Sequence, residues 1–244
     1  VKEPQEDERN LLTPEHTLFT YLHLAADKKQ TEDLISSNST CIAFETVTDD
    51  QGSLPLLTPM SAIAGRMSIQ AGAHCLETRQ GGAGVLLAGA PGAEPGRVVV
   101  IGCGVVGSNA VEIAVGMGAE VIVLDRDQKT LDSIDEKYSG KVKTVFSNEN
   151  DLVSEVLKAD LTIGAVLLPG AKAPKLVNKE MVSEMKSGSV IVDVAIDQGG
   201  CVETAHPTTH SDPTFVIDEV VHYCVANMPG AVPRTATISL TNTI

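Results

Sequence analysis

Short apolar runs alternate with amphipathic stretches along most of this chain. Between residues 97 and 227 there are roughly six apolar runs of strand length, separated by stretches with helical periodicity. The expected strands cover 98–101, 121–124, 141–146, 159–166 and 189–196, the expected helices cover 129–138, 150–158 and 179–186, and apolar segments at 214–220 and 222–227 close the region. Strands that alternate with helices form a parallel sheet with right-handed crossovers. The pattern therefore predicts an α/β fold with a doubly wound parallel sheet of the Rossmann type.

Residues 1–56 have a helix and strand pattern of their own. An apolar segment at 17–26 precedes a helix-like stretch at 27–37, and residues 41–47 indicate a buried strand. Residues 54–76 indicate a turn that leads into a long helix, for which Ser61 is a plausible N-cap. We therefore expect part of a second α/β domain at the start of the chain.

The first strand–helix–strand unit of the sheet carries a specific glycine spacing. Gly102, Gly104 and Gly107 follow the run 98–101, and the next strand ends at Asp125. The first glycine permits a tight turn, the second lets the backbone approach a pyrophosphate, and the third lets the helix pack closely on the strand. The helix N-terminus then offers N–H groups to phosphates. The spacing predicts a dinucleotide site, with a glycine-tolerant turn in another α/β unit as the alternative.

Asp125 refines this prediction. The carboxylate is in place to accept hydrogen bonds from an adenosine ribose diol. It would repel the 2′-phosphate of NADP, so the predicted cofactor is NAD.

Composition and charge exclude several other classes. Of the 244 residues, 43% are hydrophobic and 3% aromatic, which is typical of parallel strands buried on both faces. The net charge of −14 argues against nucleic acid and against an anionic membrane surface as partners. The sequence has no stretch of about 18 apolar residues, so no membrane span is predicted. No GxSxG, HExxH or Walker A pattern supports a hydrolase or a phosphoryl transferase.

The cysteines and histidines indicate no metal site. The cysteines are odd in number and have no CxxC spacing; they are Cys41, Cys75, Cys103, Cys201 and Cys224. Such cysteines are typical of reduced thiols in a cytoplasmic protein. The six histidines are scattered as well, so we expect no bound metal.

A few other residues are candidates for chemistry, and each has a structural alternative. Asp197 and Asn227 follow apolar runs, so both are expected at the carboxyl edge of the sheet, where ligands bind. Asp197 suits proton transfer or the orientation of a substrate ammonium, but also suits the capping of backbone N–H groups. His23 lies in an apolar stretch, where a core role and an acid–base role both stay open. From its local sequence, Lys2 is expected to be a solvated lysine. Segment 164–174 is expected to form either a loop over the nicotinamide or an ordinary βα loop.

Several short segments together resemble the alanine dehydrogenase family over nearly the whole chain. They are VKEP (1–4), TYLHLAA (20–26), FETV (44–47), LPLLTPMSAIAGR (54–66), GCGVVG (102–107), GAVLLPGAKAP (164–174), VDVAIDQGG (192–200) and CVANMPGAVP (224–233). The last three are far more specific than the glycine motif.

The resemblance implies an NAD-linked enzyme that converts L-alanine to pyruvate and ammonium and catalyses the reverse reductive amination. By motif, Lys2 is similar to a substrate-binding lysine, His23 to the histidine that bonds the keto oxygen, and Asp197 to the catalytic aspartate. Ser61 is similar to a serine at the cofactor phosphates, and Asn227 to the residue beside the nicotinamide.

The resemblance also implies a domain plan and a homo-oligomer, a hexamer. Residues 1–56 would be part of the substrate domain, 57–234 the NAD-binding domain, and 235–244 the start of the return to the substrate domain. The family's opening segment, with an arginine that grips the substrate carboxylate, and its closing helices have no counterpart here, so we expect a fragment. A catalytically incomplete NAD-binding polypeptide and a transhydrogenase-type nucleotide-binding domain remain as alternatives.

Overall fold

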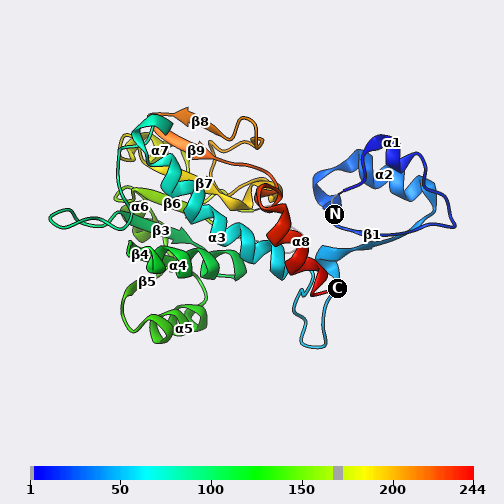
Figure 1. Ribbon diagram of the computed structural model, residues 1–244, viewed down its shortest axis with the longest axis horizontal. Coiled ribbons are helices and arrows are strands. Elements are labelled where there is room, and N and C mark those ends of the chain that lie inside the picture. The colour runs from blue at the N-terminus through cyan, green and yellow to red at the C-terminus, as the bar shows by residue number, and fades with distance from the viewer. Residues whose placement is uncertain (1–2, 167–172) are drawn as a thin grey trace. The chain divides into compact units, whose positions relative to one another are not determined.

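The computed structural model describes residues 3–166 and 173–244, and the chain divides into two compact units. The larger unit is Ser61–Val232. The smaller unit combines Val1–Met60 with Pro233–Ile244 (Figure 1).

A single sheet forms the centre of the larger unit. Its described strands are β3 (Arg97–Ile101), β4 (Glu120–Asp125), β5 (Val142–Phe146), β6 (Leu161–Gly164), β7 (Val190–Asp193), β8 (Thr214–Ile217) and β9 (Val220–Tyr223). They lie in the order β5-β4-β3-β6-β7-β9-β8. From β3 the chain moves outward through β4 and β5, and from β6 it moves outward in the other direction. This is the doubly wound order with its switch point between β3 and β6, and it confirms the predicted fold class.

One edge of the sheet departs from the expected parallel arrangement. β8 pairs with β9 antiparallel, with Ile217 opposite Val220. Between them Asp218 and Glu219 both have positive φ, 48° and 61°, as a two-residue hairpin turn requires. The apolar run expected at 214–220 is therefore strand β8 up to Ile217, a two-residue turn, and the first residue of β9.

Helices cover both faces of this sheet, and alternate residues of each strand serve two separate cores. The helices of the larger unit are α3 (Thr58–Cys75), which begins just before it, α4 (Val105–Gly116), α5 (Gln128–Tyr138), α6 (Glu149–Val156) and α7 (Lys179–Glu184). Val98 and Val100 lie in a core with residues of α3, α4 and α5, whereas Val99 and Ile101 lie in a core with residues of α6 and α7. Burial on both faces explains the continuous apolar runs seen in the sequence.

Helix α3 begins one turn earlier than the sequence suggested. It starts at Thr58, with Pro59 in the first turn, a position that a fixed φ suits. Ser61 therefore lies inside the first turn and is not the N-cap.

The smaller unit is built on two parallel strands, β1 (Thr17–Thr20) and β2 (Thr40–Ala43). It also contains α1 (Glu6–Arg9), α2 (Lys28–Ser37) and α8 (Pro233–Thr241). Its core consists of Tyr21, Phe44, Leu56 and Leu240. The strand expected at 41–47 ends at Ala43, because the chain turns into the 3₁₀ helix Phe44–Thr46 and buries Phe44 against Tyr21, with ring centroids 5.2 Å apart.

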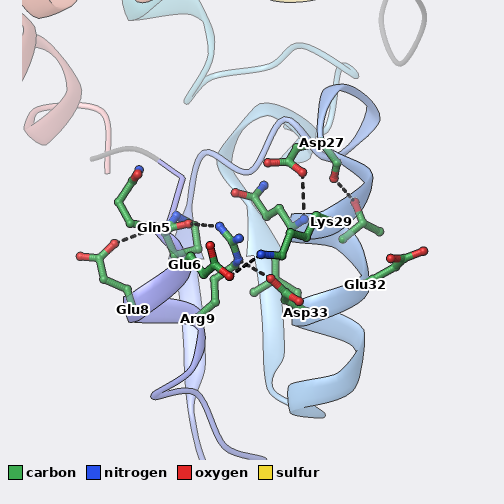
Figure 2. Close-up of polar contacts among 12 residues, drawn as sticks. Gln5, Glu6, Glu8, Arg9, Asp27, Lys29, Glu32 and Asp33 are labelled. Carbon is green, nitrogen blue, oxygen red and sulfur yellow. Dashed lines mark hydrogen bonds and ion pairs between the residues drawn. The ribbon is translucent and has the colours of Figure 1, made fainter.

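Polar contacts join α1 to α2 and hold the segment before α1 (Figure 2). The Arg9 guanidinium, whose side chain is only 8% exposed, donates from Nε to Asp33 over 2.9 Å and from Nη1 to the carbonyl of Pro4 over 2.8 Å. Lys29 forms an ion pair with Glu6. These contacts fix the backbone at Pro4 relative to the two helices.

Candidate active site

The glycine turn lies at the switch point of the sheet. Gly102 follows β3 with φ of +87°, and a Cβ built on Gly107 would lie 1.9 Å from the Gly102 carbonyl oxygen. Helix and strand can approach this closely only because Gly107 has no side chain. Around a Cβ built on Gly104, in contrast, no heavy atom lies within 4 Å. This open space at the start of α4 suits a ligand that approaches the backbone.

Asp125 ends β4 directly beside this turn. Its Oδ2 accepts a hydrogen bond from the N–H of Cys103 over 2.6 Å, and its Oδ1 accepts one from the N–H of Asp127 over 2.9 Å. The carboxylate therefore holds the turn and faces the same edge of the sheet. Burial, and then the charge of Asp125, raises the pKa of the Cys103 thiol to about 12, so Cys103 stays protonated and unreactive.

Ser61 belongs to the end of α3 that points toward this edge. A Cβ on Gly72 would lie 2.5 Å from Leu161, at the start of β6, and a Cβ on Gly65 would lie 2.1 Å from the carbonyl oxygen of Val106, in the first turn of α4. Helix α3 thus runs opposite to the strands, and its N-terminal turn with Ser61 lies toward the carboxyl edge.

Asp197 and Asn227 meet on the other side of the switch point. The strand expected at 189–196 ends at Asp193, and the chain continues as the 3₁₀ helix Val194–Gln198 that carries Asp197. The N–H of Asn227 lies 3.5 Å from Asp197 Oδ2, a long and weak hydrogen bond. Asn227 has a left-handed backbone with φ of 57°. The two residues, 30 positions apart in the sequence, therefore share one surface.

The support beneath Asp197 is a buried carboxylate that sequence reasoning missed. Asp193 is 1% exposed, and its oxygens accept hydrogen bonds from the N–H groups of Ala195 over 3.1 Å and Val202 over 3.0 Å. The Cys201 thiol contacts it at 3.7 Å. Burial raises the pKa of Asp193, and the hydrogen bond from Val202 opposes this shift. The side chain ties together the two ends of the turn that presents Asp197.

His23 lies in the smaller unit, just after β1. Its backbone is left-handed, with φ of 44° and ψ of 42°, a conformation that is uncommon outside glycine. Its Nδ1 contacts the carboxylate of Glu3, and its backbone N–H donates to Glu45 over 2.6 Å. Sequence reasoning missed Glu3 and Glu45, although both lie in segments that carry the family resemblance, VKEP and FETV.

The predicted site residues therefore fall into two groups. The larger unit brings Ser61, Gly102, Gly104, Gly107, Asp125, Asp197 and Asn227 to one edge of its sheet. His23 belongs to the smaller unit. Lys2 lies outside the described residues, as does most of the loop at 164–174.

The described residues contain neither a candidate metal cluster nor a candidate membrane span. Among residues 3–166 and 173–244, no group of three or more His, Cys, Asp or Glu side chains could hold a metal ion. Within the same ranges no helix is long and apolar enough to span a bilayer.

Family models match both parts of the chain. The model described as "Alanine dehydrogenase/PNT, N-terminal domain" matches residues 1–64, and "Alanine dehydrogenase/PNT, C-terminal domain" matches residues 68–244. The chain belongs to the alanine dehydrogenase/PNT family. This assignment confirms the resemblance seen in the sequence.

Individual relatives agree with this assignment. The alanine dehydrogenase of Halomonas elongata is 61% identical over 242 residues, which are 99% of this chain and 65% of that protein. A solved L-alanine dehydrogenase superposes with a TM-score of 0.93 at 53% identity, covering 99% of this chain and 67% of that one. A transhydrogenase from Sinorhizobium meliloti shares the fold, with a TM-score of 0.81 at 19% identity, covering 99% of this chain and 70% of that one. The chain thus spans about two thirds of the length of these proteins.

Proposed function

We propose that this chain carries out, or belongs to a protein that carries out, NAD-linked oxidative deamination of L-alanine to pyruvate and ammonium, and the reverse reductive amination. The observation that carries the proposal is the 61% identity, over 99% of this chain, to a protein named alanine dehydrogenase. The more distant transhydrogenase, at 19% identity, supports the fold alone.

The residues at the sheet edge fit a dinucleotide. The open space at Gly104 and the first N–H groups of α4 suit the pyrophosphate, and Ser61 would add a hydroxyl near the phosphates. Asp125 faces the adenosine ribose position, and Asp197 and Asn227 would flank the nicotinamide end. When bound, NAD supplies the ring that accepts or donates a hydride.

The remaining chemistry falls to side chains of the chain. A neutral imidazole is suited to proton transfer near pH 7, so we assign His23 as the acid or base at the keto oxygen. Asp197 is the carboxylate assigned to orient the substrate ammonium or to share in proton transfer. Lys2 is assigned to substrate binding on family resemblance.

The coarser organisation of the protein belongs to the same proposal. We assign residues 1–56 and 235–244 to the substrate domain and 57–234 to the NAD domain. A cytoplasmic location and a homo-oligomer, a hexamer, follow from family resemblance, with L-alanine and pyruvate as the small-molecule substrates.

One observation supports a second candidate function, the binding of NADH without turnover. The chain covers 65% of the length of its relative, so a polypeptide that binds NADH without turnover is the competing proposal. Oxidation of NADH by the purified chain, followed at 340 nm, discriminates between them. We expect oxidation that requires both pyruvate and ammonium. NADH binding, seen by fluorescence, without such turnover would favour the competing proposal, and absence of binding would contradict both.

A further inference from the structure

The backbone at His23 has a conformation that needs external support. A non-glycine residue with φ of 44° and ψ of 42° is less stable than the same residue in an extended or right-handed conformation. Such a conformation persists when contacts from several neighbouring groups stabilise it. In the smaller unit, two carboxylates, Glu45 and Glu3, contact His23.

Glu45 is the first of these groups. Its carboxylate accepts the backbone N–H of Leu22 at 3.1 Å and 3.2 Å, one oxygen each, and the N–H of His23 at 2.6 Å. Two consecutive N–H groups aim at one carboxylate only if the chain curls around it. Glu45 follows Phe44, which is 3% exposed in the core of the unit, so the carboxylate is itself anchored.

The residues before His23 are anchored from other directions. The carbonyl of Leu22 accepts a hydrogen bond from Nε2 of Gln30 over 2.5 Å, and Gln30 is 2% exposed. The Tyr21 hydroxyl donates to the carbonyl of Leu56 over 2.5 Å. The backbone that leads into His23 therefore has little freedom apart from the turn that Glu45 holds.

Glu3 is the second supporting group, and it acts on the ring. Its carboxylate contacts Nδ1 of His23, and the imidazole lies parallel to the Tyr21 ring, with centroids 5.9 Å apart and planes 6° apart. A carboxylate accepts, so this contact assigns a proton to Nδ1. Arg9 fixes the neighbouring Pro4 carbonyl from α1 (Figure 2), which in turn locates Glu3.

We propose that Glu45 and Glu3 are positioning residues for His23: Glu45 holds its left-handed backbone, and Glu3 holds its ring with the proton on Nδ1. The catalytic consequence rests on the function proposed above. Glu3 and Glu45 lie 20 and 22 positions from His23 in the sequence, so it is the fold that brings these three residues together.

Side-chain ¹⁵N spectra of the whole histidine-labelled chain test the positioning directly, with His23→Gln used to assign the signal. Glu3→Ala and Glu45→Ala should each change the His23 ring signals, because the single tautomer or ring orientation is lost. Glu3→Gln and Glu45→Gln keep one acceptor oxygen and should retain more of the native signal. Glu32→Gln, an exposed carboxylate of α2 paired only loosely with Lys28 at 3.6 Å, is the control and should leave the signal unchanged.

Turnover provides the second measurement. In the pyruvate- and ammonium-dependent assay, Glu45→Ala should lower kcat by roughly tenfold to a hundredfold, since small misplacement of a reacting group has effects of that size. The affinity for NADH should not change, and Glu45→Gln should recover part of kcat. If Glu45→Ala does not fold, Glu45→Gln and Glu3→Ala carry the test.

The outcomes separate the two proposals. Unchanged His23 ring signals in both alanine variants would overturn the positioning proposal. Altered ring signals with an unchanged kcat would overturn its catalytic consequence. If the unmodified chain shows no turnover, the proposed function fails for this chain, while the ring spectra still decide whether the carboxylates position His23.

Discussion

At the scale of single residues, Asp125 has a structural role in the glycine turn, and we propose a second role in cofactor recognition. One oxygen of its carboxylate holds the glycine turn through Cys103, and the other holds the following loop through Asp127. In the proposed function, its negative charge also faces the ribose of the cofactor. Substitution therefore has two separable effects, one on the turn and one on the choice of cofactor.

Asp125→Ala should weaken NADH binding by roughly tenfold, the equivalent of about 1.4 kcal/mol for the lost charge-assisted hydrogen bonds. Asp125→Asn should weaken it less, because an amide oxygen can still accept from Cys103. Both variants should narrow the preference for NADH over NADPH, since the repulsion of a 2′-phosphate is lost. Fluorescence titration with the two cofactors measures this, and equal affinities in the unmodified chain would refute the role in discrimination.

His222 shows that a histidine in this chain need not be functional. It is fully buried in β9, where Val220 accepts from Nδ1 over 3.0 Å and Thr204 contacts Nε2 at 2.8 Å. Burial lowers its pKa, which keeps the ring neutral. Both ring nitrogens are used within the fold, so this histidine is a core residue.

At the scale of elements, the contact between α4 and the turn after β3 depends on a single missing side chain. A Cβ on Gly107 would meet the Gly102 carbonyl, which is backbone and cannot rotate away. Gly116, at the other end of the same helix, has no heavy atom within 4 Å of a Cβ built on it. The two glycines form a matched pair for testing close packing against helix propensity.

Gly107→Ala should lower the free energy of unfolding by about 2 kcal/mol or more, because the turn must open to accept the methyl group. It should also reduce NADH binding. Gly116→Ala should be neutral or stabilise the chain by up to about 1 kcal/mol, since alanine favours the helix. Urea denaturation followed by circular dichroism compares the two, and equal effects would show that helix propensity, not close packing, determines position 107.

At the scale of the whole molecule, the net charge of −14 is the dominant electrostatic property. Like charges spread over 244 residues repel one another in the compact state. Salt shortens the range of that repulsion, from about 30 Å at 0.01 M to about 8 Å at 0.15 M.

We therefore expect the thermal midpoint to rise by several degrees when NaCl is raised from about 10 mM to about 150 mM at pH 7. The same addition at a pH where carboxylate protonation has brought the net charge near zero should have a smaller effect. Differential scanning calorimetry at both pH values measures this. A midpoint that falls with salt at pH 7 would mean that local ion pairs, such as Arg97 with Glu120 and Glu155, outweigh the overall repulsion.

Local sequence patterns are sufficient to predict the doubly wound sheet and the position of the glycine turn. Both depend on local chemistry. Apolar runs of strand length alternate with helical periods, and glycine at 102, 104 and 107 is readable without any distant contact. Strand direction alone predicts that Asp125, Asp197 and Asn227 lie at the carboxyl edge of the sheet.

The points at which those regular patterns end depend on contacts made in the folded chain. Residues 41–47 and 189–196 read as uninterrupted strands, but the chain turns into 3₁₀ helices after Ala43 and Asp193. The turns exist because Phe44 enters a core with Leu56 and Leu240, and because Asp193 accepts hydrogen bonds from both sides of its loop. The partners of His23 could not be predicted from the sequence either, because the contacts from Glu3 and Glu45 span 20 and 22 residues. Local periodicity carries no information on pairings of that range, which are made only when the chain has folded.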